Sequence, residues 1–325
     1  MSEAVVRREG AGEVRVLTVL VLALLVGAYL SWTQKTDAVT NEKVDINDLK
    51  ADRVSEVVWM TRTQTVTVAR KKDDKDGYVW FDIVSGKSKR GFKGNKTTSV
   101  LFDSLAPFSA IRKLGSDMKP EQMKETKLER PDQKLIVRAA GGDKTYEVGG
   151  RTYGSRDWYV RPQGSKDVYL VASKVLQEID FAEGKYMQRD LKTIDKKDVS
   201  GVILKAGTKE RRLLQQSRLS PTDAYWTRVD TPDTKDESAG NYLRKLDGMT
   251  VMSYVEPTVL EGATKVLELT WLEEDKPKES MTLFRAGATG KEKYYVVSDA
   301  TSGPVEVARS IGEQAEQDLA DVLAD

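Results

Sequence analysis

A cluster of basic side chains is the stretch of this sequence whose residue types and spacing suggest chemistry. Five lysines and arginines surround Phe92: Lys87, Lys89, Arg90, Lys93 and Lys96. No acidic residue occurs from Lys87 to Phe102. Each such charge contributes on the order of 1 kcal/mol near an anionic surface, so the stretch is a candidate contact for anionic lipid headgroups or an acidic envelope polymer. The alternative, which the sequence favours, is a solvated loop between predicted elements.

Catalytic and metal-binding side chains of the commonest kinds are missing. The chain contains no cysteine and no histidine, which excludes thiol nucleophiles, disulfides, Ser-His-Asp catalysis and the usual zinc sites. Two carboxylates about 5–9 Å apart could still hydrolyse a glycosidic bond. With 51 acidic residues, however, the sequence singles out no such pair. We therefore expect a protein that is not an enzyme, with no catalytic residue, no metal and no cofactor.

Two short strings resemble ligand-binding motifs without their full pattern. Residues 73–77 resemble the start of a calcium loop, but Lys72 stands where the first carboxylate should be. Residues 287–291 resemble a phosphate loop, but the spacing between the glycines is too short. We interpret these strings, and the acidic stretch 273–277, as turns or hairpin tips.

An uncharged run at residues 16–32 predicts a single transmembrane helix. Its 17 residues cover about 25 Å, the short end of what crosses a bilayer core. Arginines precede the run, so the positive-inside rule places a tail of residues 1–15 in the cytoplasm. Residues 33–51 are then a polar linker, and the remainder is exported across a bacterial inner membrane. A cleavable signal peptide remains open, because residues 26–28 are small enough for a signal peptidase.

Short segments of alternating apolar and polar residues follow the linker. They predict strands at 54–59, 64–69, 78–81, 134–139, 144–148, 158–161 and 167–171. Helical spacing predicts helices at 97–108, around Val175 to Ile179, and at 310–323. The last helix carries an apolar stripe that we expect to pack on its own module. The fold class predicted is α+β.

The order of these elements occurs twice. Residues 199–204 repeat 54–59, the helix near Leu243 repeats the one near Leu101, and residues 295–296 and 304–307 repeat 159–160 and 167–170. Trp226 likewise repeats Trp80, and this pairing favours core anchors over a sugar-binding platform. We therefore predict two similar, duplicated modules of antiparallel sheet plus helices, at 52–192 and 195–325.

These segments also carry a family resemblance. The strings are 127–131 (KLERP), 147–149 (EVG), 153–154 (YG), 158–161 (WYVR), 168–171 (VYLV) and 189–192 (RDLK). In this order they resemble the bacterial domain-of-unknown-function family number 4340, over nearly the whole chain. Where the family usually has a glycine before the leucine of its Leu-x-x-Pro element, this chain has Lys127, which leaves open whether a tight turn forms there.

The resemblance carries expectations about function. Family members typically join an N-terminal membrane segment to a repeated α+β exported region, in association with envelope ABC transporters of the gliding-motility type. The partners implied are a transporter permease and an extracytoplasmic auxiliary subunit similar to sugar hydrolases. The family has no established catalytic residues, so none is carried over.

Three functions follow from these observations. The first is a noncatalytic, membrane-anchored accessory subunit of a bacterial envelope ABC transporter, acting by protein–protein binding outside the cytoplasm. The second is a tethered receptor for an anionic envelope polymer or lipid, and the third is a carboxylate-dependent glycan hydrolase. With 52 basic and 51 acidic residues the chain has no net field to attract nucleic acid, so we expect no such partner.

Overall fold

The computed structural model describes residues 43–72, 77–220 and 222–324. The predicted tail 1–15, the transmembrane helix 16–32 and most of the linker 33–51 lie outside these residues. Among the described residues, no helix combines the length and apolar character needed to cross a bilayer. From Val44 onward the chain forms one compact unit.

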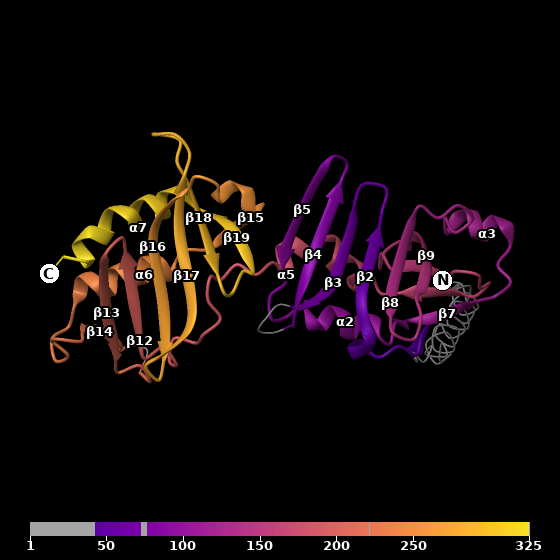
Figure 1. The fold of residues 1–325 in the computed structure, drawn as a ribbon. Helices are drawn as coiled ribbons and strands as arrows, with labels where there is room; N and C mark the ends of the chain where they lie inside the picture. Colours follow the sequence, from indigo (N-terminus) through magenta and orange to yellow (C-terminus); the bar gives the residue numbers. More distant parts are fainter. Residues whose placement is uncertain (1–42, 73–76, 221, 325) are drawn as a thin grey trace, which may run out of the picture. The chain divides into compact units, whose positions relative to one another are not determined.

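In the described part of the chain, nine antiparallel strands form the first sheet, in the order β5-β4-β3-β2-β8-β9-β10-β11-β7 (Figure 1). Their bounds are β2 (Val54–Met60), β3 (Thr65–Lys72), β4 (Gly77–Ser85), β5 (Ser88–Lys93), β7 (Arg112–Gly115), β8 (Gln133–Ala139), β9 (Lys144–Arg151), β10 (Trp158–Pro162) and β11 (Val168–Val171). Val66 and Val68 are fully buried between polar neighbours. This alternation explains why period-two segments predicted strands here.

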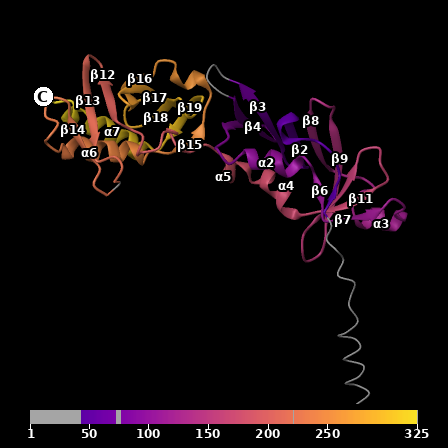
Figure 2. The same cartoon turned by 90° about the horizontal axis from the view of Figure 1, so that it is seen from below.

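Helices α2 (Ser99–Leu105) and α4 (Ser173–Asp180) lie on one face of this sheet (Figure 2). The shorter elements are η1 (Ala51–Arg53), α3 (Pro120–Glu125) and α5 (Ala182–Tyr186). Leu101 and Ile179 from the two covering helices belong to the buried core of the sheet. Helix α2 ends earlier than the predicted 97–108. Ala106, which precedes a proline, is extended, as residues before proline usually are.

Residues 44–51, predicted as the end of the linker, belong to the fold. Strand β1 (Val44–Asp45) pairs with β6 (Ser109–Ala110). Asn47 is buried, and its amide group donates a hydrogen bond of 2.7 Å to the Tyr146 hydroxyl. A buried amide must keep such partners, so this segment is held against the first core.

The second sheet has the order β14-β13-β12-β16-β17-β18-β19-β15 and is also antiparallel. Its elements are β12 (Gly201–Ala206), β13 (Lys209–Gln216), β14 (Tyr225–Arg228), α6 (Glu237–Asp247), β15 (Val251–Tyr254), η2 (Pro257–Leu260), β16 (Thr264–Glu273), β17 (Lys276–Ala286), β18 (Lys293–Ser298), β19 (Gly303–Val307) and α7 (Arg309–Val322). Helices α6 and α7 pack on one face, where the Tyr242 hydroxyl donates to the carbonyl of Ala315 at 3.1 Å.

The two sheets share one order of strands. With β5 left aside, β4-β3-β2-β8-β9-β10-β11-β7 corresponds position by position to the order of the second sheet. Helix α2 lies between β4 and β7 along the chain as α6 lies between β14 and β15, and α4 follows β11 as α7 follows β19. The segments compared in the sequence fall in corresponding elements, and the predicted α+β class is confirmed.

Candidate functional site

The predicted basic cluster lies mainly on an edge strand and not in a loop. Lys89, Arg90 and Lys93 are residues of β5, which pairs with β4. Lys87 lies in the turn between these strands, and Lys96 lies between β5 and helix α2. The sequence missed this strand because its charged residues hide the alternation that predicts one.

The pleat of β5 separates these basic side chains. Successive residues of a strand face opposite sides, so Lys89 and Lys93 lie on one face, and Arg90 and Phe92 on the other. Phe92 is buried, and its ring stacks on a neighbouring phenylalanine. The Arg90 guanidinium forms an ion pair with Glu183 at 2.9 Å. The five charges are therefore not brought onto one face.

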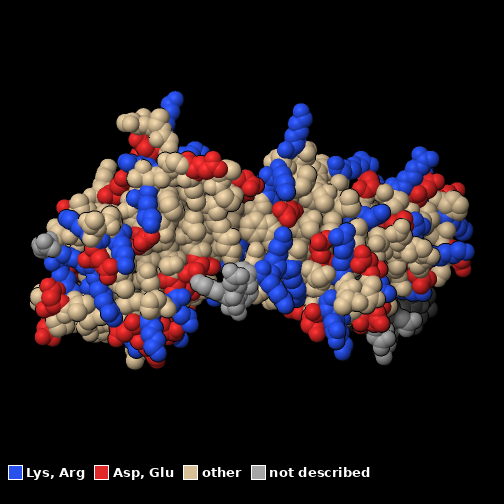
Figure 3. Space-filling view, viewed as in Figure 1, with Lys and Arg blue, Asp and Glu red and all other residues tan. Residues whose placement is uncertain are grey.

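Lysine and arginine side chains are interspersed with aspartate and glutamate over the surface shown in Figure 3. Lys93 likewise contacts a neighbouring side chain. It is half-buried, and its ammonium group lies 5.4 Å from the centroid of the Tyr78 ring. The predicted anionic-surface patch is a set of separately placed charges.

The strings that resemble ligand motifs form turns where the structure describes them. Glu274 and Asp275 make the two-residue turn between β16 and β17, both with positive φ. Residues 287–291 connect β17 to β18. Residues 73–76 lie outside the described residues. Within the described ranges, no group of three or more acidic side chains is placed to hold a metal ion.

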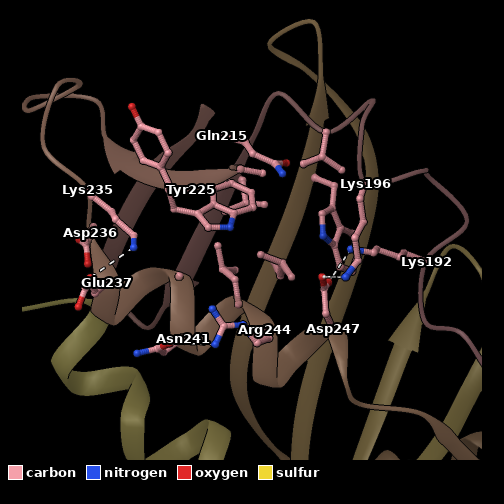
Figure 4. Close-up of a pocket in the computed structure, with 18 of the residues that line it drawn as sticks. Lys192, Lys196, Gln215, Tyr225, Lys235, Asp236, Glu237, Asn241, Arg244 and Asp247 are labelled. Atoms are coloured by element: carbon pink, nitrogen blue, oxygen red, sulfur yellow. Dashed lines mark hydrogen bonds and ion pairs between the residues drawn. The ribbon is translucent and has the colours of Figure 1, made fainter. Parts of the chain in front are cut away.

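A cleft of about 470 Å³ opens on the helix side of the second sheet. Its lining comes from β12, β13, β14 and β16, from helix α6, and from residues 192–199. Figure 4 shows Gln215 of β13 opposite Arg244 and Asp247 of α6. This volume falls within the range of about 300–1,000 Å³ that is typical of small-molecule sites.

Aromatic rings make a substantial part of the lining. Tyr225 and Trp226 come from the edge strand β14, and both are half-buried. Trp271 of β16 is 4% exposed. Trp226 packs against the second core, as the sequence predicts for a core anchor, and it also borders the cleft.

The pairing of strands relates the residues of this cleft to residues of the first sheet. In the first sheet Val57 pairs with the residue two positions before Arg70. In the second sheet the corresponding Val202 pairs with the residue two positions before Gln215. Arg70 and Gln215 thus stand at corresponding places on the helix-covered faces.

The two side chains fill that place differently. The Arg70 guanidinium lies 4.1 Å from the centroid of the Phe102 ring in α2 and donates to the carbonyl of Val54 at 3.0 Å. It therefore spans from its strand to the helix. Gln215 is shorter and uncharged, and it lines the cleft of the second sheet.

The same register corrects the pairing of the tryptophans. Val79 lies opposite Arg70, and Trp226 lies opposite Gln215, so Trp226 corresponds to Val79. Trp80 is one residue further and faces the other side of its sheet. Sequence comparison missed this because a shift of one residue in a strand reverses the face.

Charged groups of the cleft are arranged around Asp247 and Arg244. The Asp247 carboxylate forms ion pairs with the ammonium groups of Lys192, at 2.5 Å, and Lys196, at 3.3 Å. Two ammonium groups therefore share one carboxylate. The Lys192 ammonium also lies 5.4 Å from the centroid of the Trp271 ring. Arg244 donates to the side-chain oxygen of Asn241 at 3.3 Å.

Asp236 begins the helix wall of the cleft. Its carboxylate accepts the backbone N–H of Ala239 at 2.9 Å and pairs with Arg228 at 2.8 Å. Burial raises the pKa of this carboxyl, but the Ala239 amide and the Arg228 guanidinium lower it by more. The net pKa lies below the ordinary value, so Asp236 is a carboxylate and not a proton donor at neutral pH.

Asp236 and Asp247, at opposite ends of helix α6, are too far apart to act together in glycoside hydrolysis. Asp236 caps the start of helix α6 and Asp247 is its last residue, with 11 helical residues in the element. Such a helix is about 16 Å long, whereas hydrolytic pairs lie about 5–9.5 Å apart. The geometry supports binding in this cleft.

A second hollow, which we call the β7 groove, lies at the edge of the first sheet. It measures about 750 Å³ and is lined by β7, α3, and the turn between β9 and β10. Its apolar side chains are Leu114, Met118, Tyr153, Tyr159 and Leu170. Tyr153 is fully exposed to solvent.

Strand β7 is held at this edge by one acidic side chain of the neighbouring β11 hairpin. The Asp167 carboxylate accepts hydrogen bonds from the Lys113 ammonium at 2.8 Å and from the Ser116 hydroxyl at 2.5 Å. These hydrogen bonds lower the pKa of the Asp167 carboxyl below its ordinary value. Asp167 thus fixes Ser116, which lines the groove, at the end of β7.

Comparison with known proteins gives one match. No curated protein and no solved structure matches the chain. The family described as "Domain of unknown function (DUF4340)" matches residues 95–270, which include parts of both sheets. The resemblance drawn from residues 127–192 is thereby confirmed at the level of the family. The chain belongs to the family of domains of unknown function DUF4340.

Proposed function

We propose that this protein is a noncatalytic, membrane-anchored accessory subunit of a bacterial envelope ABC transporter complex. It binds partner proteins outside the cytoplasm through the α+β region from Val44 onward. Residues 16–32 serve as its anchor in the inner membrane, with the N-terminus cytoplasmic. The permease and an extracytoplasmic auxiliary subunit are its partners.

The observation that carries the binding role is the β7 groove. Tyr153 is exposed on a turn beside the groove, and Arg112 and Arg151 also line it. Tyrosine and arginine are enriched at the centres of protein interfaces, where a few such residues carry most of the binding energy. A surface that combines exposed aromatic and apolar side chains with polar and charged ones is typical of a protein interface.

The shared strand order supports the inference that the two modules arose by duplication. Within this inference the modules have diverged in use. The first has Arg70 reaching to helix α2 and the β7 groove at one edge of its sheet, whereas the second has Gln215 in the corresponding place and the cleft beside it. Protein binding is assigned to the first module.

Co-purification of partners tests the proposal. Full-length protein with Tyr153→Ala is extracted from native membranes in mild detergent, cross-linked, and its partners are identified by mass spectrometry. Leu219→Ala is the matched control, because it removes another exposed apolar side chain, 84% exposed, outside the groove. We expect wild type and L219A to recover a permease and its ATPase, and Y153A to recover at least about tenfold less.

Two results contradict different parts of the proposal. Recovery of neither transporter component with intact wild-type bait rules out the transporter role. Equal recovery with Y153A and wild type leaves the role standing and rules out the β7 groove as the contact. A chain lacking residues 1–35 measures how much the predicted anchor contributes.

A further inference from the structure

We infer that the cleft of the second module binds an acidic saccharide, a sugar that carries a carboxylate. The inference concerns a different surface from the β7 groove and does not depend on the transporter proposal. Three properties of the cleft carry it: its unbalanced positive charge, its side-chain chemistry, and the way its strand edge is closed.

The charge in the cleft is unbalanced in favour of cations. Lys192 and Lys196 share the single carboxylate of Asp247, which leaves one positive charge in excess. Arg244 is exposed and forms no ion pair with a described carboxylate, and its guanidinium donates a hydrogen bond to the neutral Asn241. A carboxylate placed between Arg244 and the two lysines would contact both groups and offset one of these two excess positive charges.

The acidic side chains at the other end of the cleft do not cancel this excess. Asp236 is engaged by Arg228 at 2.8 Å, and the exposed Glu237 pairs with Lys235 at 3.3 Å. Each of these carboxylates therefore has its own cation. The positive excess lies at the Arg244 and Asp247 end of helix α6.

Aromatic and amide groups make the rest of the cleft suited to a sugar. Trp226 brings a half-buried indole ring to the lining, and the apolar face of such a ring packs against the C–H groups of sugar rings. Gln215 and Asn241 each offer a donor and an acceptor, as hydroxyl groups require. Figure 4 shows these two amides on opposite sides of the cleft, one on strand β13 and one on helix α6.

An extended peptide would find no free strand edge here. The outer side of β14 is already occupied, since Thr227 forms a bridge with Lys235 and the N–H of Asp236 donates to the carbonyl of Trp226 at 2.8 Å. Addition of a peptide strand needs an unpaired edge, and an amphipathic helix needs an apolar groove. The charged rim of the cleft favours a small polar ligand.

Isothermal titration of the purified full-length protein in detergent micelles tests the inference. The probe is trigalacturonic acid, and its neutral counterpart is a galactose trisaccharide. Triglutamate provides a carboxylate-bearing peptide of similar charge. We expect saturable binding of trigalacturonic acid, and binding of the other two probes at least about tenfold weaker.

Arg244→Gln locates the binding, because arginine and glutamine have similar helix propensities and the side chain is exposed. The matched control is Arg212→Gln, another exposed arginine of the second module that pairs with Asp275 on the hairpin side. Loss of a charged hydrogen bond should weaken trigalacturonic acid binding at least about tenfold in R244Q and leave R212Q unchanged.

Three outcomes would overturn the inference. They are no binding of trigalacturonic acid to wild type, equal affinity of R244Q and wild type, and equal or tighter binding of triglutamate. None of these outcomes bears on the co-purification of transporter subunits, so the two proposals fail independently.

Discussion

Lys127 holds a backbone conformation that lysine rarely adopts. Its φ is 58°, in the turn that follows helix α3, where the family usually has glycine. The tight turn that the sequence left open is therefore formed. Backbone hydrogen bonds hold it, since the N–H groups of Leu128 and Glu129 both donate to the carbonyl of Met123. The turn carries a local strain that glycine would not have.

We predict that Lys127→Gly stabilises the protein. The left-handed conformation costs a non-glycine residue about 1–2 kcal/mol, and the greater freedom of glycine in the unfolded chain offsets part of the gain. The expected increase in the free energy of unfolding is about 0.5–1 kcal/mol, measured by urea denaturation. Lys124→Gly, within α3, is the control and should destabilise by about 1 kcal/mol. A lower free energy of unfolding in K127G than in wild type would contradict the inferred backbone strain at Lys127.

Helix α6 depends on one side chain at its start. Asp236 accepts the N–H of Ala239 and pairs with Arg228, so it satisfies a free helix donor and orients the wall of the cleft. Its pKa is lowered in the folded protein. The stabilisation is therefore complete above the ordinary aspartate pKa of about 4 and is lost as the pH falls through the lower folded value.

We predict that Asp236→Ala lowers the free energy of unfolding by about 1–2 kcal/mol at neutral pH. The difference from wild type should shrink as the pH is lowered from about 6 to about 3, because the wild-type carboxyl becomes protonated. Urea denaturation at several pH values measures both effects. Glu237→Gln, at an exposed side chain, should change stability by no more than about 0.5 kcal/mol. A pH-independent difference would contradict the assigned pKa shift.

At the scale of the whole molecule, the described residues contain two buried cores. Met187 is the last buried residue of the first core along the chain, and Leu191 is the first of the second. No fully buried residue is common to both. Each sheet with its helices therefore has the apolar interior that independent folding requires.

We predict that a fragment of residues 188–325 folds on its own. It should unfold in urea in one cooperative transition, with a slope m smaller than that of the full chain, because less surface becomes exposed. Circular dichroism follows the transition. The fragment 44–187 provides the complementary measurement for the first sheet. A broad, noncooperative transition of either fragment would show that its core is insufficient alone.

Much of the secondary structure was predictable because it depends on near neighbours. Strands at 134–139 and 158–161 follow from alternating apolar side chains, which any half-buried strand shows. Strands β5 and β13 escaped prediction because their solvent-facing residues are charged and interrupt that signal. The repeated order of elements was visible for the same local reason, since each module repeats the same succession of patterns.

The cleft could not be predicted from these local patterns. Its lining comes from distant segments, with Gln215, Arg244 and Trp271 on three separate elements and Lys192 in the connection before β12. Whether Trp226 faces the helices or the opposite side depends on a register difference of one residue. Pairing between strands and packing of α6 set that register. Composition and periodicity thus specify the α+β elements, whereas long-range pairing in the folded chain creates the site.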